Sequence, residues 1–173
     1  MAAPRTFTAF QAGGRVAAGT LGDIIDSLGQ RGLKLNRVMV FNDATGDLLK
    51  LNTDDDLTVA KAEPVAQMSA SPVTLEVRIP ERDRDWLERQ SGGSSAAIRR
   101  LVSAARRDPA SLAREAQSAA YRFISMLAGD LPGYEEACRA LFAGALDRFD
   151  AATAAWAPDI RAHARRLGWR TRV

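Results

Sequence analysis

The sequence has one cysteine, one histidine and no long apolar run. The lone Cys138 cannot form a disulfide within the chain, and it suits a reducing compartment. No stretch approaches the length of a membrane span. The opening MAAPRTFTAF lacks the apolar centre of a secretory signal. We therefore expect a cytoplasmic protein with no membrane contact.

Motifs that bind phosphate or perform nucleophilic catalysis are also missing. No Walker or Rossmann glycine loop is present, and Gly13-Gly14 is typical of a hairpin turn. Cys138 and His163 could form a dyad, but Cys138 lies on an apolar helical stripe, where cysteine usually acts as a small hydrophobic residue. A single histidine with a distant cysteine does not supply the ligands of an ordinary zinc site.

Acidic residues gather at Asp43, Asp47 and 54–56. Their spacing does not match an EF-hand loop, and NDATGD (42–47) is good turn chemistry. Glu135 and Glu136 fit the first turn of a helix, where the dipole favours them. We therefore expect no enzyme activity, no metal and no cofactor.

Lysine is scarce: the chain has 3 lysines and 21 arginines. The net charge is +3, and residues 73–107 alone carry eight basic and five acidic side chains. Arginine makes bidentate contacts with phosphate. An arginine- and alanine-rich chain is also what a GC-rich genome encodes, so composition alone does not decide for nucleic acid.

Hydrophobic periodicity predicts an α+β fold. Residues 1–62 are expected to form a small ββαββ sheet unit, with strands at 5–10, 15–19, 37–41 and 48–51. Its helix follows Thr20, with Asp23 completing a capping box and Gly32 ending it. A turn of helix is expected behind Thr53, and residues 63–72, with two prolines, are read as a linker.

From Asp108 the pattern is helical, and residues 108–173 are expected to form a C-terminal helical bundle. Asp108 caps a helix that continues to about Ala128. A second helix restarts at Pro132, with one apolar face from Tyr134 to Phe149, and Pro158 begins the last helix.

Residues 73–107 predict a central strand–helix–helix element. VTLEVRI (73–79) alternates apolar and polar residues as a strand does. Pro80 begins a helix that Gly92 and Gly93 end, and Ser94 or Ser95 is expected to cap the next helix. This order resembles the ribbon–helix–helix family, in which two chains pair their strands into an antiparallel ribbon that enters the major groove of DNA.

The resemblance implies a homodimer that binds double-stranded DNA. Thr74, Glu76 and Arg78 would face the bases. The backbone amides of Ser94 and Ser95 would hold a phosphate, helped by Arg99 and Arg100 on a basic face that also carries Arg106 and Arg107. The implied core is Leu75, Val77, Ile79, Trp86, Leu87, Ile98, Leu101, Val102 and Ala105.

Two features depart from that family. The first helix is about one turn short, and Glu76 repels phosphate unless it reads a cytosine. A different arrangement would extend the N-terminal sheet with the 73–79 strand, pack both helices over it and leave the arginines in solvent. A protein-interaction or scaffold module without nucleic acid is therefore the alternative function.

Four phrases also resemble one bacterial family, domain-of-unknown-function family 2239. They are RTFTAFQ (5–11), VFNDATG (40–46), RDWLERQSGGSSAAIRRLVSAARR (84–107) and YRFISMLAGDLPGYEEACRALFAG (121–144), followed by W-A-P-D-I-R-A-H. Asn42 stands where this family is expected to have an acidic residue, which argues against a metal there. The resemblance implies that the C-terminal helices belong with the rest, and it brings no assigned activity.

Overall fold

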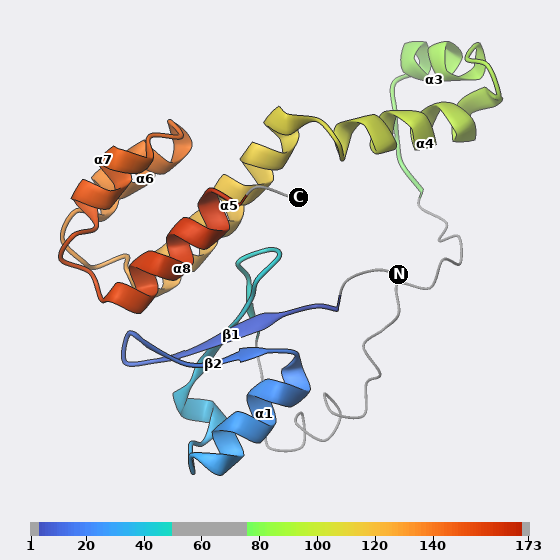
Figure 1. Ribbon diagram of the computed structural model, residues 1–173. Coiled ribbons are helices and arrows are strands. Elements are labelled where there is room, and N and C mark those ends of the chain that lie inside the picture. The colour runs from blue at the N-terminus through green and yellow to red at the C-terminus, as the bar shows by residue number, and fades with distance from the viewer. Residues whose placement is uncertain (1–3, 50–75, 171–173) are drawn as a thin grey trace. The chain divides into compact units, whose positions relative to one another are not determined.

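The computed structural model describes residues 4–49 and 76–170 (Figure 1). The chain divides into two compact units. We call residues 1–67 with 113–173 the sheet unit, and residues 68–112 the central unit. The expected turn of helix behind Thr53 and the expected linker 63–72 lie outside the described residues. The protein is an α+β chain, as its periodicity predicted.

The sheet unit begins with an antiparallel sheet in the order β2-β1-β3-β4. Its strands are β1 (Phe7–Gln11), β2 (Gly14–Gly19), β3 (Met39–Asn42) and β4 (Leu48–Leu49). The four predicted strands are confirmed, with boundaries shifted by up to two residues where both ends are described. Residues 50 and 51, assigned to the last strand, lie outside the described part.

The β1–β2 turn corrects one expectation about the glycines. Positive φ occurs at Ala12 (48°) and Gly13 (82°), whereas Gly14 already belongs to β2. Positive φ at both central residues is the pattern of a type I′ turn, which follows the twist of the strands it connects. Ala12 therefore takes the left-handed conformation that had been expected at Gly14.

Helix α1 (Leu21–Gln30) crosses from β2 towards the short 3-10 helix η1 (Leu35–Arg37). Its predicted capping box is present: Thr20 Oγ1 accepts from the amide of Asp23 at 3.3 Å, and Asp23 Oδ2 accepts from the amide of Thr20 at 2.8 Å. Ile24 and Leu28, four residues apart, are buried against the sheet residues Ala9 and Val40.

The remaining helices follow the predicted breaks, with one exception. They are α3 (Glu81–Glu88), α4 (Gly93–Ala105), α5 (Pro109–Leu127), α6 (Tyr134–Phe142), α7 (Leu146–Ala152) and α8 (Pro158–Gly168). Asp108 caps α5 by accepting from the amide of Ser111 at 2.8 Å. The continuous face from Tyr134 to Phe149 is wrong, because Gly144, at φ 67°, separates α6 from α7 and Phe142 is left exposed.

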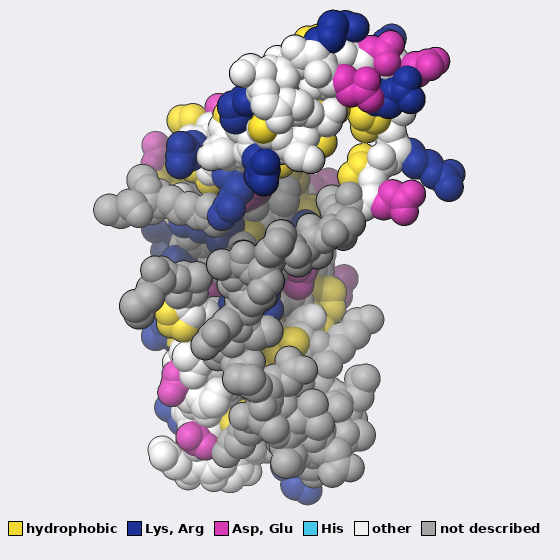
Figure 2. Space-filling view, turned by 90° about the vertical axis from the view of Figure 1, so that its right-hand side faces the viewer, with side chains coloured by type: hydrophobic (Ala, Val, Ile, Leu, Met, Phe, Trp, Pro, Cys, Tyr) yellow, Lys and Arg dark blue, Asp and Glu magenta, His cyan; other side chains and the backbone are white. Residues whose placement is uncertain are grey.

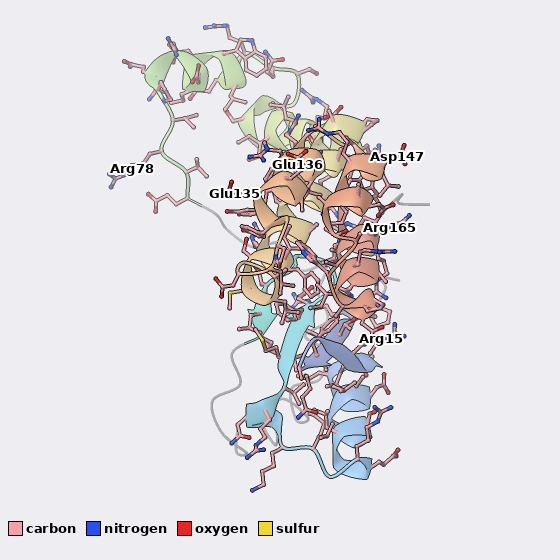
Figure 3. All side chains as sticks on the ribbon, turned by 90° about the vertical axis from the view of Figure 1, so that its left-hand side faces the viewer. Arg15, Arg78, Glu135, Glu136, Asp147 and Arg165 are labelled. Carbon is pink, nitrogen blue, oxygen red and sulfur yellow. The ribbon has the colours of Figure 1, made fainter. Side chains whose placement is uncertain are left out.

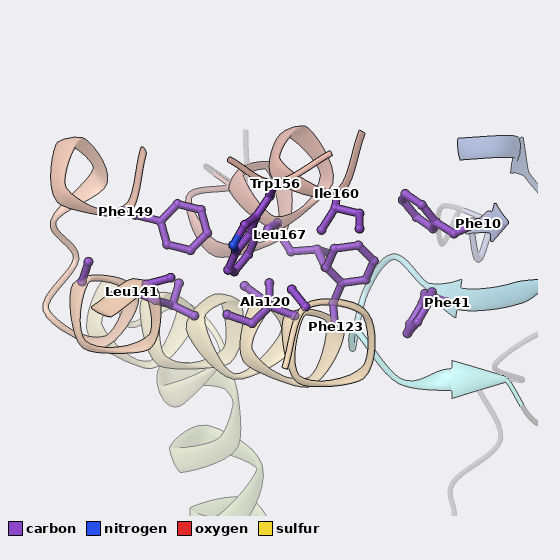
Figure 4. Packing of buried hydrophobic residues seen from close by; sticks show 14 residues of the cluster. Phe10, Phe41, Ala120, Phe123, Leu141, Phe149, Trp156, Ile160 and Leu167 are labelled. Carbon is purple, nitrogen blue, oxygen red and sulfur yellow. The ribbon is translucent and has the colours of Figure 1, made fainter. Parts of the chain in front are cut away.

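The main core joins the sheet to the C-terminal helices (Figure 4). Phe10 of β1 and Phe41 of β3 lie with their ring centroids 5.2 and 5.0 Å from that of Phe123 on α5. Ile160 and Leu167 of α8 belong to the same cluster. The C-terminal helices therefore share a hydrophobic core with the N-terminal sheet, as the family resemblance implied.

The β3–β4 turn depends on Gly46. Its φ is 72°, and a Cβ there would overlap the backbone carbonyl of Ala119 on α5. We expect Gly46→Ala to lower the free energy of unfolding by about 3 kcal/mol, through strain and overpacking. Urea unfolding measures this.

Gly29→Ala is the matched control. Gly29 is exposed on α1 with no atom near its would-be Cβ. Alanine there should raise the free energy of unfolding by up to about 1 kcal/mol. Equal effects of the two substitutions would contradict the close approach of the turn to α5.

Candidate nucleic-acid interface

Residues 76–80 precede α3 and form no strand in the single chain. All five are exposed, and Figure 3 shows Arg78 projecting from this segment. Of the predicted 73–79 strand, residues 73–75, including Thr74, lie outside the described part. The strand prediction is thus not met over 76–79, and these residues do not extend the sheet. A strand needs a neighbour for its backbone groups, and no described strand of the chain pairs with this segment.

The turn from α3 to α4 corrects the predicted cap. Gly92, at φ 82°, is the N-cap residue, and α4 starts at Gly93 with no side-chain cap. Ser94 and Ser95 therefore lie inside the first turn instead of capping it. Arg100 Nη1 donates to the carbonyl of Ser91 at 2.8 Å, which ties α4 to the preceding turn.

The expected core of the central unit is largely exposed in the single chain. Among its described residues only Leu87 and Ala97 are buried. The remaining expected core residues that are described are all exposed, and the six large ones by 42–62% of their surface: Val77, Ile79, Trp86, Ile98, Leu101 and Val102. Ala105 is exposed too, and Leu75 lies outside the described residues. Of the implied core residues that are described, the single chain therefore buries only Leu87.

Helix α4 separates its apolar and basic side chains. Ile98, Leu101 and Val102 are spaced three and four residues apart and share one exposed face. Arg99 and Arg106, seven residues apart, lie along another face. Figure 2 shows basic and apolar side chains on the surface of the central unit.

The arginines of α4 differ from those of α3 in their partners. Arg84 of α3 makes ion pairs with Glu81, Asp85 and Glu88. Within the described ranges, Arg99 of α4 and the two arginines that directly follow the helix, Arg106 and Arg107, form no ion pair, and α4 itself carries no acidic residue. Their charge is therefore available to an external anion.

A second polar cluster, not foreseen as a site, lies in the sheet unit. Arg166 of α8 donates from Nη2 to Thr8 Oγ1 (3.0 Å), Asp43 Oδ1 (3.3 Å) and, by its geometry, His163 Nδ1 (2.8 Å). Thr8 also donates to Asp43 at 2.8 Å. With Nδ1 accepting, the imidazole is neutral and carries its proton on Nε2, which lies 3.7 Å from Asp43 Oδ1 without a hydrogen bond.

This cluster joins β1, the β3–β4 turn and α8, with Thr8 and His163 buried and the Arg166 side chain half exposed at its edge. Thr8 is fully buried and His163 is 4% exposed. A sequence signal for it existed: His163 falls at an apolar position of α8, three residues after Ile160 and four before Leu167. We interpret it as a structural junction.

The other candidate residues are not brought together as a site. Cys138 lies beside Tyr134, and burial raises the pKa of its thiol. Asp47 pairs with Arg122, and residues 54–56 lie outside the described part. Figure 3 shows Glu135 and Glu136 at the start of α6, as expected. Over residues 4–49 and 76–170, no three potential metal ligands gather, and no helix is both long and apolar enough to cross a bilayer.

Burial, and then the positive charge of Arg166, lower the pKa of His163 to about 4. The unfolded chain binds this proton near pH 6.5, so stability is fully present above pH 6.5 and falls as the pH drops towards 4. We expect a loss of about 3 kcal/mol across that window. A proton NMR titration of the only histidine, with urea unfolding at each pH, measures both quantities.

His163→Gln is the control, because glutamine does not titrate. It should flatten the slope between pH 6.5 and 4.5, whatever its effect on absolute stability. A His163 resonance that titrates near 6.5 would contradict the buried neutral imidazole.

The comparisons with known proteins support one identification. The family model described as an uncharacterized protein conserved in bacteria (DUF2239) matches residues 6–168, and the chain belongs to this family. The family resemblance seen in the sequence is thereby confirmed. No curated protein and no solved structure gave a match.

Proposed function

We propose that this chain is a non-catalytic, DNA-binding transcriptional regulator of the cytoplasm, which acts as a homodimer through its central unit. One observation carries the proposal: α4 has an exposed apolar face, and Arg99 with the following Arg106 lies on a separate face with no ion pair among the described residues. The apolar face is suited to binding a protein, and the arginine face is suited to binding a polyanion.

The apolar face supports dimerisation. Six large apolar side chains of one small unit are 42–62% exposed, whereas the larger sheet unit leaves only Tyr121, Met126 and Phe142 in that class among its described residues. Concentrated exposure of this kind marks an interaction surface. A second copy covering it would supply the core that a single central unit lacks.

The arginines and the start of α4 support a DNA partner. Arg99, Arg106 and Arg107 have no acidic partner among the residues described, and arginine binds phosphate bidentately. The amides of Ser94 and Ser95 belong to a helix start with no side-chain cap, where an anion is favoured. Arg100 donates one N–H to the carbonyl of Ser91, which stabilises this turn. Its other guanidinium N–H groups can donate to a phosphate.

Base recognition is assigned to Thr74, Glu76 and Arg78. Arg78 is exposed and has the geometry to donate to two acceptors of guanine. The competing proposal is a protein-interaction module without nucleic acid, which the apolar face alone would also serve. Only the arginine face separates the two proposals.

We expect Leu101→Glu to convert the dimer to monomers, because it places a charge in the apolar face, and to weaken DNA binding with it. Sedimentation equilibrium measures the first effect. Met126→Glu is the matched control, since Met126 is 53% exposed and Leu101 52%, and Met126 belongs to the sheet unit. Equal association of both variants would argue against this face.

Duplex DNA should bind with an affinity that falls steeply with salt, because binding releases condensed counterions. Fluorescence anisotropy with mixed-sequence duplex at two salt concentrations measures this. The logarithmic slope should be about −0.9 for each phosphate contacted. An absence of binding at low salt would sink the DNA proposal and favour the interaction module.

Two arginines should behave differently on DNA. Arg78→Ala should relax sequence preference by about 1–3 kcal/mol, whereas Arg99→Ala should weaken all sequences alike and reduce the salt slope by about 1. The same titrations, repeated on a selected and a mixed duplex, separate these effects. Arg5→Ala removes an exposed arginine of the sheet unit and should change neither the sequence preference nor the overall DNA affinity. A loss of affinity as large as that of Arg99→Ala would indicate nonspecific charge attraction.

A further inference from the structure

Glu76 and Arg78 carry opposite charges two residues apart on an exposed segment. Neither forms an ion pair with any described residue, although the charges of the adjoining helix α3 are extensively paired. Val77 between them is 62% exposed, the largest exposed fraction among the large apolar side chains described. The segment therefore has unused charge of both signs and unused apolar surface.

A segment of this kind can be complementary to itself. When two identical strands pair antiparallel about a two-fold axis, opposed residues share a face of the ribbon. Side chains alternate between the faces. The apolar Val77 and Ile79 of both copies therefore lie on one face only if the two-fold axis relates a residue to its own copy directly opposite. An axis that falls between two residue positions would place them opposite the charged residues.

The charges select one axis among the described residues 76–79. An axis through Val77 places Glu76 opposite Arg78 of the partner subunit, and does so twice by symmetry. An axis through Glu76 or through Arg78 opposes that charge to its own copy. An axis through Ile79 sets Arg78 against Pro80 and requires strand pairing at Glu81, which already belongs to α3. Opposite charges directly across a strand pair are stabilising, and like charges destabilise it.

We infer that two copies of this chain pair their 76–78 segments antiparallel about Val77, held in register by two Glu76–Arg78 ion pairs between subunits. The inference rests on the proposed dimeric function and adds the register and the residues that determine it. It also accounts for Glu76 on a DNA-facing surface: the guanidinium opposite it neutralises a carboxylate that would otherwise repel phosphate.

Charge reversal and charge exchange in the full-length chain test this register. The dimer dissociation constant is measured by sedimentation equilibrium, without DNA, for wild type, E76R, R78E and the exchange E76R/R78E. Each single reversal opposes like charges at two symmetric places and should raise the constant by about tenfold or more. The exchange restores both opposite pairs and should return it to within about threefold of wild type.

Glu115→Arg and Arg89→Glu are the matched controls. Both residues are exposed, and each substitution changes the net charge as E76R or R78E does, outside the segment. They should leave the constant unchanged. Single reversals that act no more strongly than these controls, an exchange that is as weak as the single reversals, or a wild type that stays monomeric would each overturn the inference.

DNA titration of the same variants keeps the two proposals separate. If the exchange restores the dimer while wild type does not bind duplex at low salt, the register stands and the DNA function fails. If wild type binds DNA but the exchange does not restore the dimer, the DNA function stands and the register fails.

Discussion

Contact between Phe10, Phe41 and Phe123 is the constraint on which the sheet unit depends. Phe10 and Phe41 come from neighbouring strands, and Phe123 comes from a helix more than eighty residues further along the chain. Their rings pack at centroid distances of 5.0–6.1 Å, close to edge-to-face in two of the three pairs. Helix α1 covers one face of the sheet. The other face, which carries Phe10 and Phe41, is covered by α5 and α8.

The polar junction beside these rings makes that closure specific. His163 lies with its ring centroid 4.5 Å from that of Phe123, and its Nδ1 lies beside Arg166, which also binds Asp43. Burying an imidazole is unfavourable for its charged form, so the ring is neutral there. A hydrogen-bonded polar cluster within an apolar core restricts how α8 can sit on the sheet.

The buried apolar clusters of the sheet unit consist of that unit's own residues, and the central unit buries few of its described residues. Two buried residues, Leu87 and Ala97, cannot stabilise a unit of this size. Its exposed apolar face, its unpaired arginines and the self-complementary Glu76-Val77-Arg78 segment are then related facts. Each is without a partner among the described residues of one chain, and each would acquire one in the DNA-bound dimer that we propose.

Local features of this protein followed from the sequence alone, because they depend on neighbours along the chain. The Thr20–Asp23 capping box, the Asp108 cap and the presence of strands near β1 and β2 required no knowledge of distant contacts. Predictions that needed to know what covers a face were less secure. Phe142 shares a helical stripe with Leu141 and Tyr134 but is exposed, and Ile98 and Leu101 have a core pattern without a core.

The candidate interface shows the same division. Its arginines, its glycine turn and its alternating segment were evident from residue order, whereas the open cap at Gly92 and the tie from Arg100 to Ser91 were not. The sequence by itself determined where helices begin, which side chains alternate and where positive charge collects. Only the tertiary structure decided that Thr8, Asp43 and His163 meet, and that the central helices keep an uncovered apolar face, because burial depends on which distant segments a face finds.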